Sequence, residues 1–241
     1  MRNKRRWILG GAAIMAIALG GAYWYLFGGS EPAEVALASP SPGGAAQSGS
    51  TVSFDGSFDG TWTIDTESGS FEDFTSTFAG YRVEEELGGV GANTAVGRTP
   101  DVSGSLQVEG TTITAVSVEV DMTTLTSDDA RRDNSLGTRG LETQSLPTAT
   151  FELTEPTEVG RTPERGEIIE VDAVGELTLH GVTREVTVPI EARWTGERIE
   201  VVASFEVALA DYEIEPPTGL LVLSIADVGT VEMNLLFQKA S

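Results

Sequence analysis

Residues 175–194 read GELTLHGVTREVTVPIEARW, and apolar and polar side chains alternate along most of this stretch. One face of its second half carries Val186, Val188, Ile190, Ala192 and Trp194. The opposite face carries Thr187, Glu191 and Arg193. A period of two is typical of a β-strand with one buried and one wet face. The dipeptide His180-Gly181 predicts a two-residue turn, so the stretch predicts an antiparallel hairpin.

The same alternation recurs through the rest of the chain. Strands are predicted at residues 61–66, 103–110, 112–122, 149–154, 167–179, 184–194, 198–210 and 230–238, with a further long one at 71–87. Strands joined by short turns without interleaved helices predict an antiparallel sandwich or a closed barrel. Closure is favoured because it removes unpaired edges. An eight-stranded barrel is just wide enough to be filled by side chains or to hold one slender ligand, and composition leaves both interiors open.

The N-terminal region predicts a membrane anchor. Residues 7–27 are 21 uncharged, mostly apolar positions, enough for a transmembrane helix. The basic residues in 1–6 precede it, so the positive-inside rule places this tail in the cytoplasm. The alternative is a cleaved signal peptide with a site at Ala36–Ala38, although the apolar run is longer than such peptides use. Either outcome places the remaining chain outside the cytoplasm.

The predicted organisation therefore has four parts. A basic tail (1–6) and a transmembrane helix (7–27) are followed by a flexible linker rich in Gly, Ser and Pro (28–58) and by one β-barrel domain (59–241).

Composition excludes several function classes. The formal net charge of −22 repels phosphate backbones, so nucleic acid is not an expected partner. The chain has no cysteine and one histidine, which excludes disulfides, cysteine nucleophiles and multi-histidine metal sites. No G-x-S-x-G motif occurs. We therefore expect no enzyme activity, no metal and no cofactor apart from a bound lipid.

Two local features have simple structural interpretations. His180 is predicted to be a solvated turn residue. The Gly-rich segment 88–100, GGVGANTAVGRTP, lacks the Lys-Ser/Thr end of a phosphate-binding loop and is predicted to be a mobile hairpin loop.

The segment 131–153, RRDNSLGTRGLETQSLPTATFEL, interrupts the alternation. A helix is predicted from about 128 to 135, with Thr126 or Ser127 as its N-cap. Gly137 or Gly140 would end it, and Pro147 prevents its continuation before the next strand. Because acidic residues balance its arginines, the segment is not a basic patch.

Several motifs occur in a characteristic order. They are GTWTID (60–65), RRDNSL (131–136), LPTATFEL (146–153), GELTLHGVTREVTVPI (175–190) and Asp211-Tyr212-x-Ile214. Together they resemble the YceI-like family of extracytoplasmic, polyisoprenoid-binding proteins, over about residues 59–239. GYRVEEEL (80–87) and AVGRTPDVSG (95–104) resemble a membrane-anchored branch of it. The segment 71–82 lacks a histidine that many relatives carry, and Leu209 stands where many have an arginine.

The resemblance implies an eight-stranded lipocalin-like barrel whose apolar tunnel binds, stores or transports a polyisoprenoid, quinone-like or other amphiphilic lipid. The candidate tunnel residues are Phe74, Phe78, Val118, Val120, Phe151, Leu177, Leu179, Val188, Ile190, Phe205 and Leu235. The candidate head-group residues are Arg82, Arg98 and Arg132, for which the alternative is a structural ion pair. The rival function is a structural or protein-interaction module of the cell envelope with a filled barrel. A hydrolase is a third hypothesis, without a recognisable set of catalytic residues.

Overall fold

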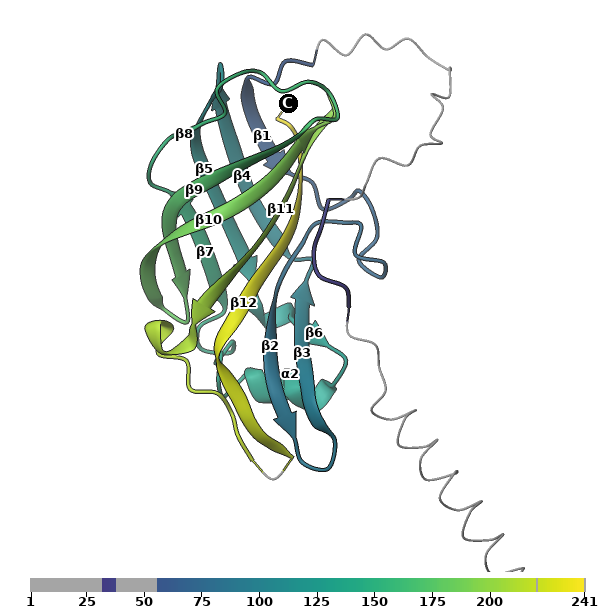
Figure 1. Cartoon of the computed structure of the whole chain (residues 1–241), viewed down its shortest axis with the longest axis vertical. Helices are drawn as coiled ribbons and strands as arrows, with labels where there is room; N and C mark the ends of the chain where they lie inside the picture. The colour runs from purple at the N-terminus through teal and green to yellow at the C-terminus, as the bar shows by residue number, and fades with distance from the viewer. Residues whose placement is uncertain (1–31, 38–55, 220, 241) are drawn as a thin grey trace, which may run out of the picture. The chain divides into compact units, whose positions relative to one another are not determined.

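The folded part of the chain is built almost entirely from β-strands (Figure 1). The computed structural model describes residues 32–37, 56–219 and 221–240. Its strands are β1 (Gly60–Ile64), β2 (Phe78–Leu87), β3 (Gly91–Thr99), β4 (Val102–Glu109), β5 (Thr112–Asp121), β6 (Thr126–Ser127), β7 (Thr148–Leu153), β8 (Thr157–Glu158), β9 (Ile168–Leu179), β10 (Val182–Trp194), β11 (Arg198–Ala208) and β12 (Val222–Lys239). Short helical segments lie between them: η1 (Met122–Thr124), α2 (Ala130–Leu136) and η2 (Leu209–Tyr212).

Eight of the described strands close into a ring. Their order is β1-β4-β5-β7-β9-β10-β11-β12, and β12 returns to pair with β1. Trp62 on β1 lies opposite Lys239 on β12 and Leu106 on β4, so β1 joins the two ends of the sheet. All of these pairings are antiparallel. The predicted closed, eight-stranded antiparallel barrel is confirmed.

The hairpin of β2 and β3 branches from this ring. β12 has 18 residues and β1 has five, so β1 can cover only one end of the β12 edge. β2 pairs with the other end, between Val222 and Asn234. β3 then pairs with β2 and with the two-residue β6. The wall beside β12 therefore consists of β1 at one end of the barrel and of β2 and β3 at the other.

The hairpin of β9 and β10 has the predicted register. Val182 pairs with Leu179, which leaves His180 and Gly181 as the turn. Both turn residues have positive φ, 52° and 74°, as a type I′ turn requires. On β10 the buried side chains are Val188, Ala192 and Trp194, all on the predicted apolar face.

Residues 71–87 do not form the single long strand that their alternation predicted. β2 begins only at Phe78, and residues 71–74 form turns. The carboxylate of Asp73 accepts hydrogen bonds from the backbone N (3.2 Å) and hydroxyl (2.7 Å) of Thr75. Phe74 has a left-handed φ of 56°. Local bonds of this kind compete with strand pairing, so the strand starts after they end.

The Gly-rich segment 88–100 is also different from the prediction. It is mostly strand β3, which pairs with β2 from Gly91 to Thr99. Gly97 lies opposite Tyr81, and a Cβ at Gly97 would lie 2.4 Å from Tyr81 Cε1. Small residues on β3 thus accommodate large ones on β2, which removes the apolar period by which a strand is recognised.

The predicted short helix is present as α2, but its cap lies further along the chain than Thr126 or Ser127. Asp129 is the N-cap, and its carboxylate accepts a hydrogen bond from the backbone N of Arg131 at 2.8 Å. Gly137 ends the helix, as predicted.

Parts of the predicted linker, residues 28–58, are attached to the barrel. Phe58 is buried in the core, and its carbonyl accepts a hydrogen bond from Trp62 Nε1 at 3.0 Å. The carbonyl of Ala33 accepts one from Arg98 Nη2 at 2.8 Å. The folded unit therefore includes residues before 59. The predicted transmembrane segment 7–27 lies outside the described residues, among which no helix is long and apolar enough to cross a membrane.

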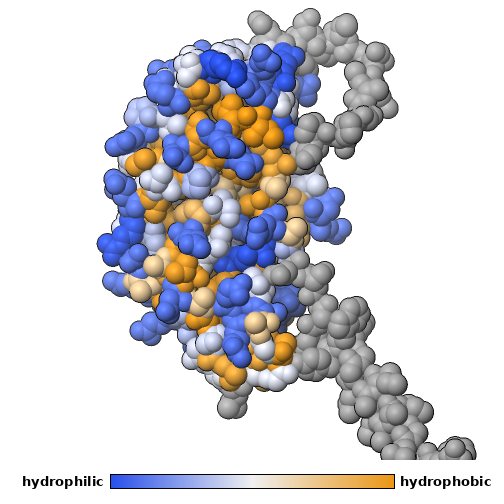
Figure 2. Space-filling model, in the orientation of Figure 1, coloured by the Kyte–Doolittle hydropathy of each residue, from blue (hydrophilic) through white to orange (hydrophobic). Residues whose placement is uncertain are grey.

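The outer surface is mostly polar but not uniformly so. Figure 2 shows hydrophilic residues over much of the visible face and apolar areas near its upper and lower ends. The most exposed large apolar side chains include Val90 in the β2–β3 turn and Leu221 and Leu223 at the start of β12. These segments touch, since Gly88 N donates to Leu221 O at 2.8 Å.

Candidate functional site

The barrel contains a partly open apolar cavity of about 150 Å³, called here the large cavity. It lies at the end of the barrel where β2 is the neighbour of β12. Its apolar lining is Ala79, Val83, Val118, Val120, Met122, Leu125, Leu136, Leu141, Ala149, Phe151, Leu177, Leu179, Val207, Leu209, Ile214, Pro216, Pro217, Ile225, Val231 and Met233. A cavity lined in this way offers water few hydrogen-bond partners and therefore favours an apolar occupant.

A second apolar cavity of about 70 Å³, the small cavity, lies further along the same interior. Its lining includes Phe58, Leu106, Ile113, Val116, Phe151, Leu153, Ile169, Val171, Ala173, Val188, Ile190, Ala192, Trp194, Ile199, Val201, Met233, Leu235 and Phe237. The closed sheet is therefore neither an open tube nor a completely filled core.

Most of the predicted tunnel residues line one of these cavities. Val118, Val120, Phe151, Leu177 and Leu179 line the large cavity. Val188, Ile190 and Leu235, again with Phe151, line the small cavity. Phe205 is buried in the same core but lines neither. The predicted tunnel residues that line the cavities come from five strands, β5, β7, β9, β10 and β12. That each of them contacts a ligand stays a prediction.

Phe74 and Phe78 line neither cavity, so their predicted place in the tunnel is corrected. Their rings pack edge to face, with centroids 5.6 Å apart, and the Arg98 guanidinium lies 4.4 Å and 4.6 Å from those centroids. Phe78 pairs with Asn234, whose neighbours Met233 and Leu235 point inward, so Phe78 points outward. The prediction treated residues 71–87 as one strand, although residues 71–74 form turns and β2 begins at Phe78. Phe78 was therefore assigned to the inner face of the sheet, whereas it lies on the outer face.

Arg82, Arg98 and Glu232 form what we call the outer ion cluster. Glu232 has no exposed side-chain surface, and its carboxylate oxygens accept from Arg82 Nε at 3.0 Å and Arg98 Nη2 at 2.9 Å. Two predicted head-group residues thus make structural ion pairs with one carboxylate. Arg82 also contributes atoms to the large-cavity wall, whereas Arg98 does not.

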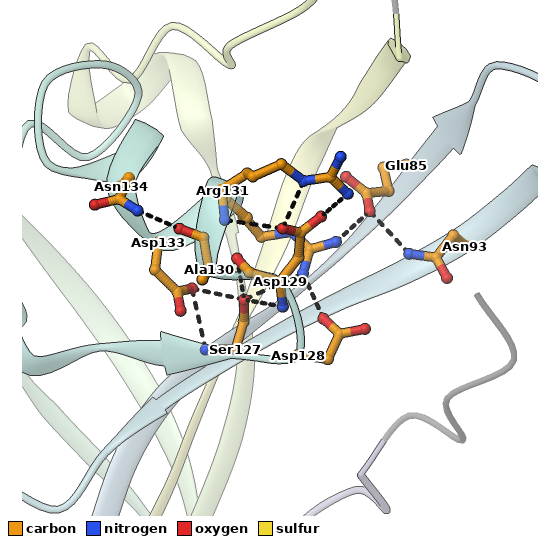
Figure 3. A network of polar contacts seen from close by, with 10 residues as sticks. Glu85, Asn93, Ser127, Asp128, Asp129, Ala130, Arg131, Asp133 and Asn134 are labelled. Carbon is orange, nitrogen blue, oxygen red and sulfur yellow. Dashed lines mark hydrogen bonds and ion pairs between the residues drawn. The ribbon is translucent and has the colours of Figure 1, made fainter. Parts of the chain in front are cut away.

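Figure 3 shows a polar network around Glu85, Asp128 and Asp129, to which Arg132 of α2 belongs. Arg132 donates to Glu85 Oε1 at 2.7 Å and to Asp128 Oδ1 at 2.6 Å. In the same network, hydrogen bonds from the side chain and backbone of Arg131 keep the pKa of Asp129 below its usual value, against an opposing effect of burial. Arg132, like Arg82 and Arg98, therefore forms ion pairs with carboxylates of the protein itself.

Tyr81 was not predicted as a site residue, yet it lines the large cavity. Its Oη is buried without a hydrogen-bond partner among the described residues. Burial raises the pKa of the phenol well above its usual value, so it is a neutral donor at physiological pH. Tyr81 alternates with Ala79 and Val83 along β2, and this pattern could have placed it on the inner face. The strand was predicted to begin at residue 71 instead of Phe78, and the pattern was therefore missed.

His180 is not the solvated turn residue that was predicted. Its side chain is only 12% exposed, and its Nε2 lies 3.7 Å from Glu142 Oε2. Nδ1 lies 3.0 Å from the carbonyl oxygen of Tyr212. The imidazole therefore connects the β9–β10 turn to η2, at the end of the barrel that holds the large cavity.

The profile of the YceI-like domain family matches residues 46–237, which cover the barrel except for the last two residues of β12. The chain belongs to this family. It is 33% identical over 106 residues to a UPF0312 protein of Vibrio parahaemolyticus, covering 41% of this chain and 52% of the relative. It is 32% identical over 113 residues to the protein YceI of Escherichia coli O157:H7, covering 43% and 54%. The YceI-like chain thus aligns with about half the length of these curated relatives.

Solved structures show the same fold. A polyisoprenoid binding domain from Saccharophagus degradans superposes with a TM-score of 0.56 at 18% identity, covering 74% of this chain and 98% of that one. BcnA of Burkholderia cenocepacia superposes with a TM-score of 0.50 at 14% identity, covering 66% and 95%. The predicted YceI-like, lipocalin-like barrel is confirmed by the family match and by this likeness.

Proposed function

We propose that this YceI-like barrel binds the apolar tail of an isoprenoid, quinone-like or other lipid in the large cavity. The observation that carries the proposal is the apolar space of about 150 Å³ inside a closed sheet. The family match supports it, as does the structural likeness to a polyisoprenoid binding domain of another organism. No nucleophile, metal or redox group takes part in binding of this kind.

The size of the cavity limits what is held. An engineered cavity of about this volume accommodates one benzene, which is similar in size to the five carbons of one isoprene unit. At roughly 0.8 kcal/mol per buried carbon, that unit contributes about 4 kcal/mol. A free energy of this size corresponds to a Kd of about 1 mM. Useful affinity therefore requires further contacts, from more of the tail or from a polar end.

Tyr81 is the proposed contact for a polar end. Tyr81 lines the large cavity, and its hydroxyl is buried beside the backbone of Gly97 without a hydrogen-bond partner in the described part of the chain. A lipid hydroxyl or carbonyl group would satisfy it. This assignment replaces the arginines as first candidate, because each of them already forms an ion pair.

The proposed setting is extracytoplasmic. The apolar segment 7–27 follows a basic tail, and the barrel would lie on the far side of the membrane from that tail. A carrier held at a membrane would store a lipid or transfer it from the bilayer to an acceptor.

Photolabelling of the full chain in membranes tests the binding proposal. The probe is an isoprenoid alcohol with a photoreactive group on its tail, and labelled peptides are identified by mass spectrometry. We expect labels at Val118 and Leu177, and a loss of about tenfold in Val118→Trp, whose indole fills the large cavity.

The matched control is Thr187→Trp, which places the same side chain on the exposed face of β10 and should label like the parent. Thermal unfolding checks that both variants fold. If the unmodified barrel takes no label, the lipid proposal fails and the filled structural or interaction module is favoured. If Val118→Trp folds and labels fully, binding occurs elsewhere.

A further inference from the structure

The two cavities meet at one level of the barrel, and only two described residues line both. These are Phe151 on β7 and Met233 on β12. On β7, Ala149 lines the large cavity and Leu153 the small one, with Phe151 between them. On β12, Val231 and Leu235 flank Met233 in the same way. On both strands, the inward side chains before this residue line the large cavity and those after it line the small cavity.

Phe151 and Met233 come from opposite walls. In the ring order β1-β4-β5-β7-β9-β10-β11-β12, β7 and β12 are half the ring apart. Both side chains point into the interior, at the level where one cavity ends and the other begins. We call this pair of side chains the partition.

The Phe151 ring lies over Gly175, where no side chain is present. On β9, Ala173 lines the small cavity and Leu177 the large one, and Gly175 lies between them without a side chain. A Cβ on Gly175 would lie 2.5 Å from Phe151 Cζ and 2.7 Å from Cε2. The ring of Phe151 therefore occupies the space that a residue at 175 would fill. The partition is seated against the β9 backbone and has a defined position.

Resting on the proposed lipid binding, we infer that Phe151 and Met233 determine how much of an isoprenoid tail the barrel accepts. With the partition in place, the tail end stops in the large cavity. With the partition displaced, the tail reaches the small cavity, which adds apolar space of about 70 Å³. Met233 is the part of the partition that we expect to move, because its unbranched side chain can adopt several conformations. The Phe151 ring packs against the backbone of Gly175 and has less freedom.

Tail-tip photolabelling of the full chain in membranes tests this inference. Two probes carry the photoreactive group at the tail end, one of geranyl and one of octaprenyl length. In the parent protein both tips should label large-cavity residues such as Leu177 and leave Val188 and Leu235 unlabelled. In Phe151→Leu and, independently, Met233→Ala, the octaprenyl tip should label Val188 and Leu235 at least several-fold more than in the parent.

Phe205→Leu is the matched control. Phe205 is buried in the same core to a similar extent, 9% exposed against 8% for Phe151, but lines neither cavity. It should keep the parent pattern. Comparing variants with the same probe cancels the partitioning of that probe into the membrane.

The outcomes separate this inference from the proposed function. If octaprenyl tips label the small cavity equally in the parent and in folded Phe151→Leu, the partition is refuted while lipid binding stands. If Phe205→Leu opens the small cavity as much as Phe151→Leu does, a general loosening of the core replaces a specific partition. If no probe labels either cavity in any variant, the binding proposal itself fails.

Discussion

Glu232 is fully buried, which its sequence context does not indicate. It lies on a strand among apolar neighbours, and its fully buried carboxylate bridges Arg82 and Arg98. The cluster lies on the outer face of the sheet, under Phe74 and Phe78, whose rings contact the Arg98 guanidinium. Arg98 Nη2 also holds the carbonyl of Ala33. One carboxylate therefore helps to attach both covering segments to the barrel.

We expect Glu232→Gln to lower the free energy of unfolding by about 3 kcal/mol, because it removes the counter-charge shared by the buried Arg98 and the partly buried Arg82. Urea unfolding followed by tryptophan fluorescence measures the loss.

Glu167→Gln is the comparison, since the ion pair of Glu167 with Arg161 is largely exposed. Exposed pairs contribute little, so this variant should unfold like the parent. Equal losses in the two variants would show that burial of the outer ion cluster is not the cause.

At the scale of elements, β2 and β3 are matched to each other through Gly97 and Tyr81. The Tyr81 ring covers the backbone of Gly97, on the side that faces the large cavity. A side chain on β3 at this position would push the ring into the cavity. The small residues of β3 thus determine the position of a proposed ligand contact.

Gly97→Ala should therefore affect stability and binding together. The added methyl group would lie 2.4 Å from Tyr81 Cε1, and such overpacking costs about 1–3 kcal/mol. We expect a lower urea midpoint and weaker labelling of the large cavity.

Gly219→Ala is the matched control, because a Cβ placed there has no atom of a described, non-adjacent residue within 4 Å. It should leave both measurements unchanged. Full labelling of folded Gly97→Ala would mean that the position of Tyr81 does not matter for the ligand.

At the scale of the whole molecule, the strands that form the cavities and the segment proposed to anchor the chain have separate roles. The described chain from Ala33 onward forms one compact unit. Its cavities depend on closure of the ring, because every interior level is lined by strands far apart in sequence. The proposed anchor only determines on which side of a membrane the barrel lies.

The absence of cysteine from the chain makes this proposed topology directly measurable. Glu185→Cys places a thiol on the exposed face of β10, and we expect a membrane-impermeant maleimide to label it in intact cells. Asn3→Cys lies in the basic tail and should react only after lysis.

The same two variants separate an anchor from a signal peptide. If the mature Glu185→Cys protein is labelled while the mature Asn3→Cys protein contains no thiol even after lysis, the N-terminus has been cleaved off and the proposed anchor is removed. Labelling of Glu185→Cys only after lysis would contradict the extracytoplasmic proposal.

Local chemistry made much of the fold predictable. Alternation along residues 184–194 and the His180-Gly181 turn predicted a hairpin whose register the structure confirms, because both signals act between near neighbours in the chain. Pro147 likewise precedes β7, which begins at Thr148. Prediction was wrong where hydrogen bonds formed a turn at Phe74, and where small residues hid strand β3.

Strand period and turn chemistry are local properties, so the sequence alone predicted antiparallel strands joined by short turns, in a sandwich or a closed barrel. The eight-stranded barrel was implied by the resemblance to the YceI-like family. Which side chains lie together depends on the folded arrangement of the strands. Arg98 and Glu232 are 134 positions apart, and Phe151 and Met233 come from opposite strands of the ring. Ring closure and strand register bring such residues together, and they divide the interior into two cavities where the sequence shows only an apolar face.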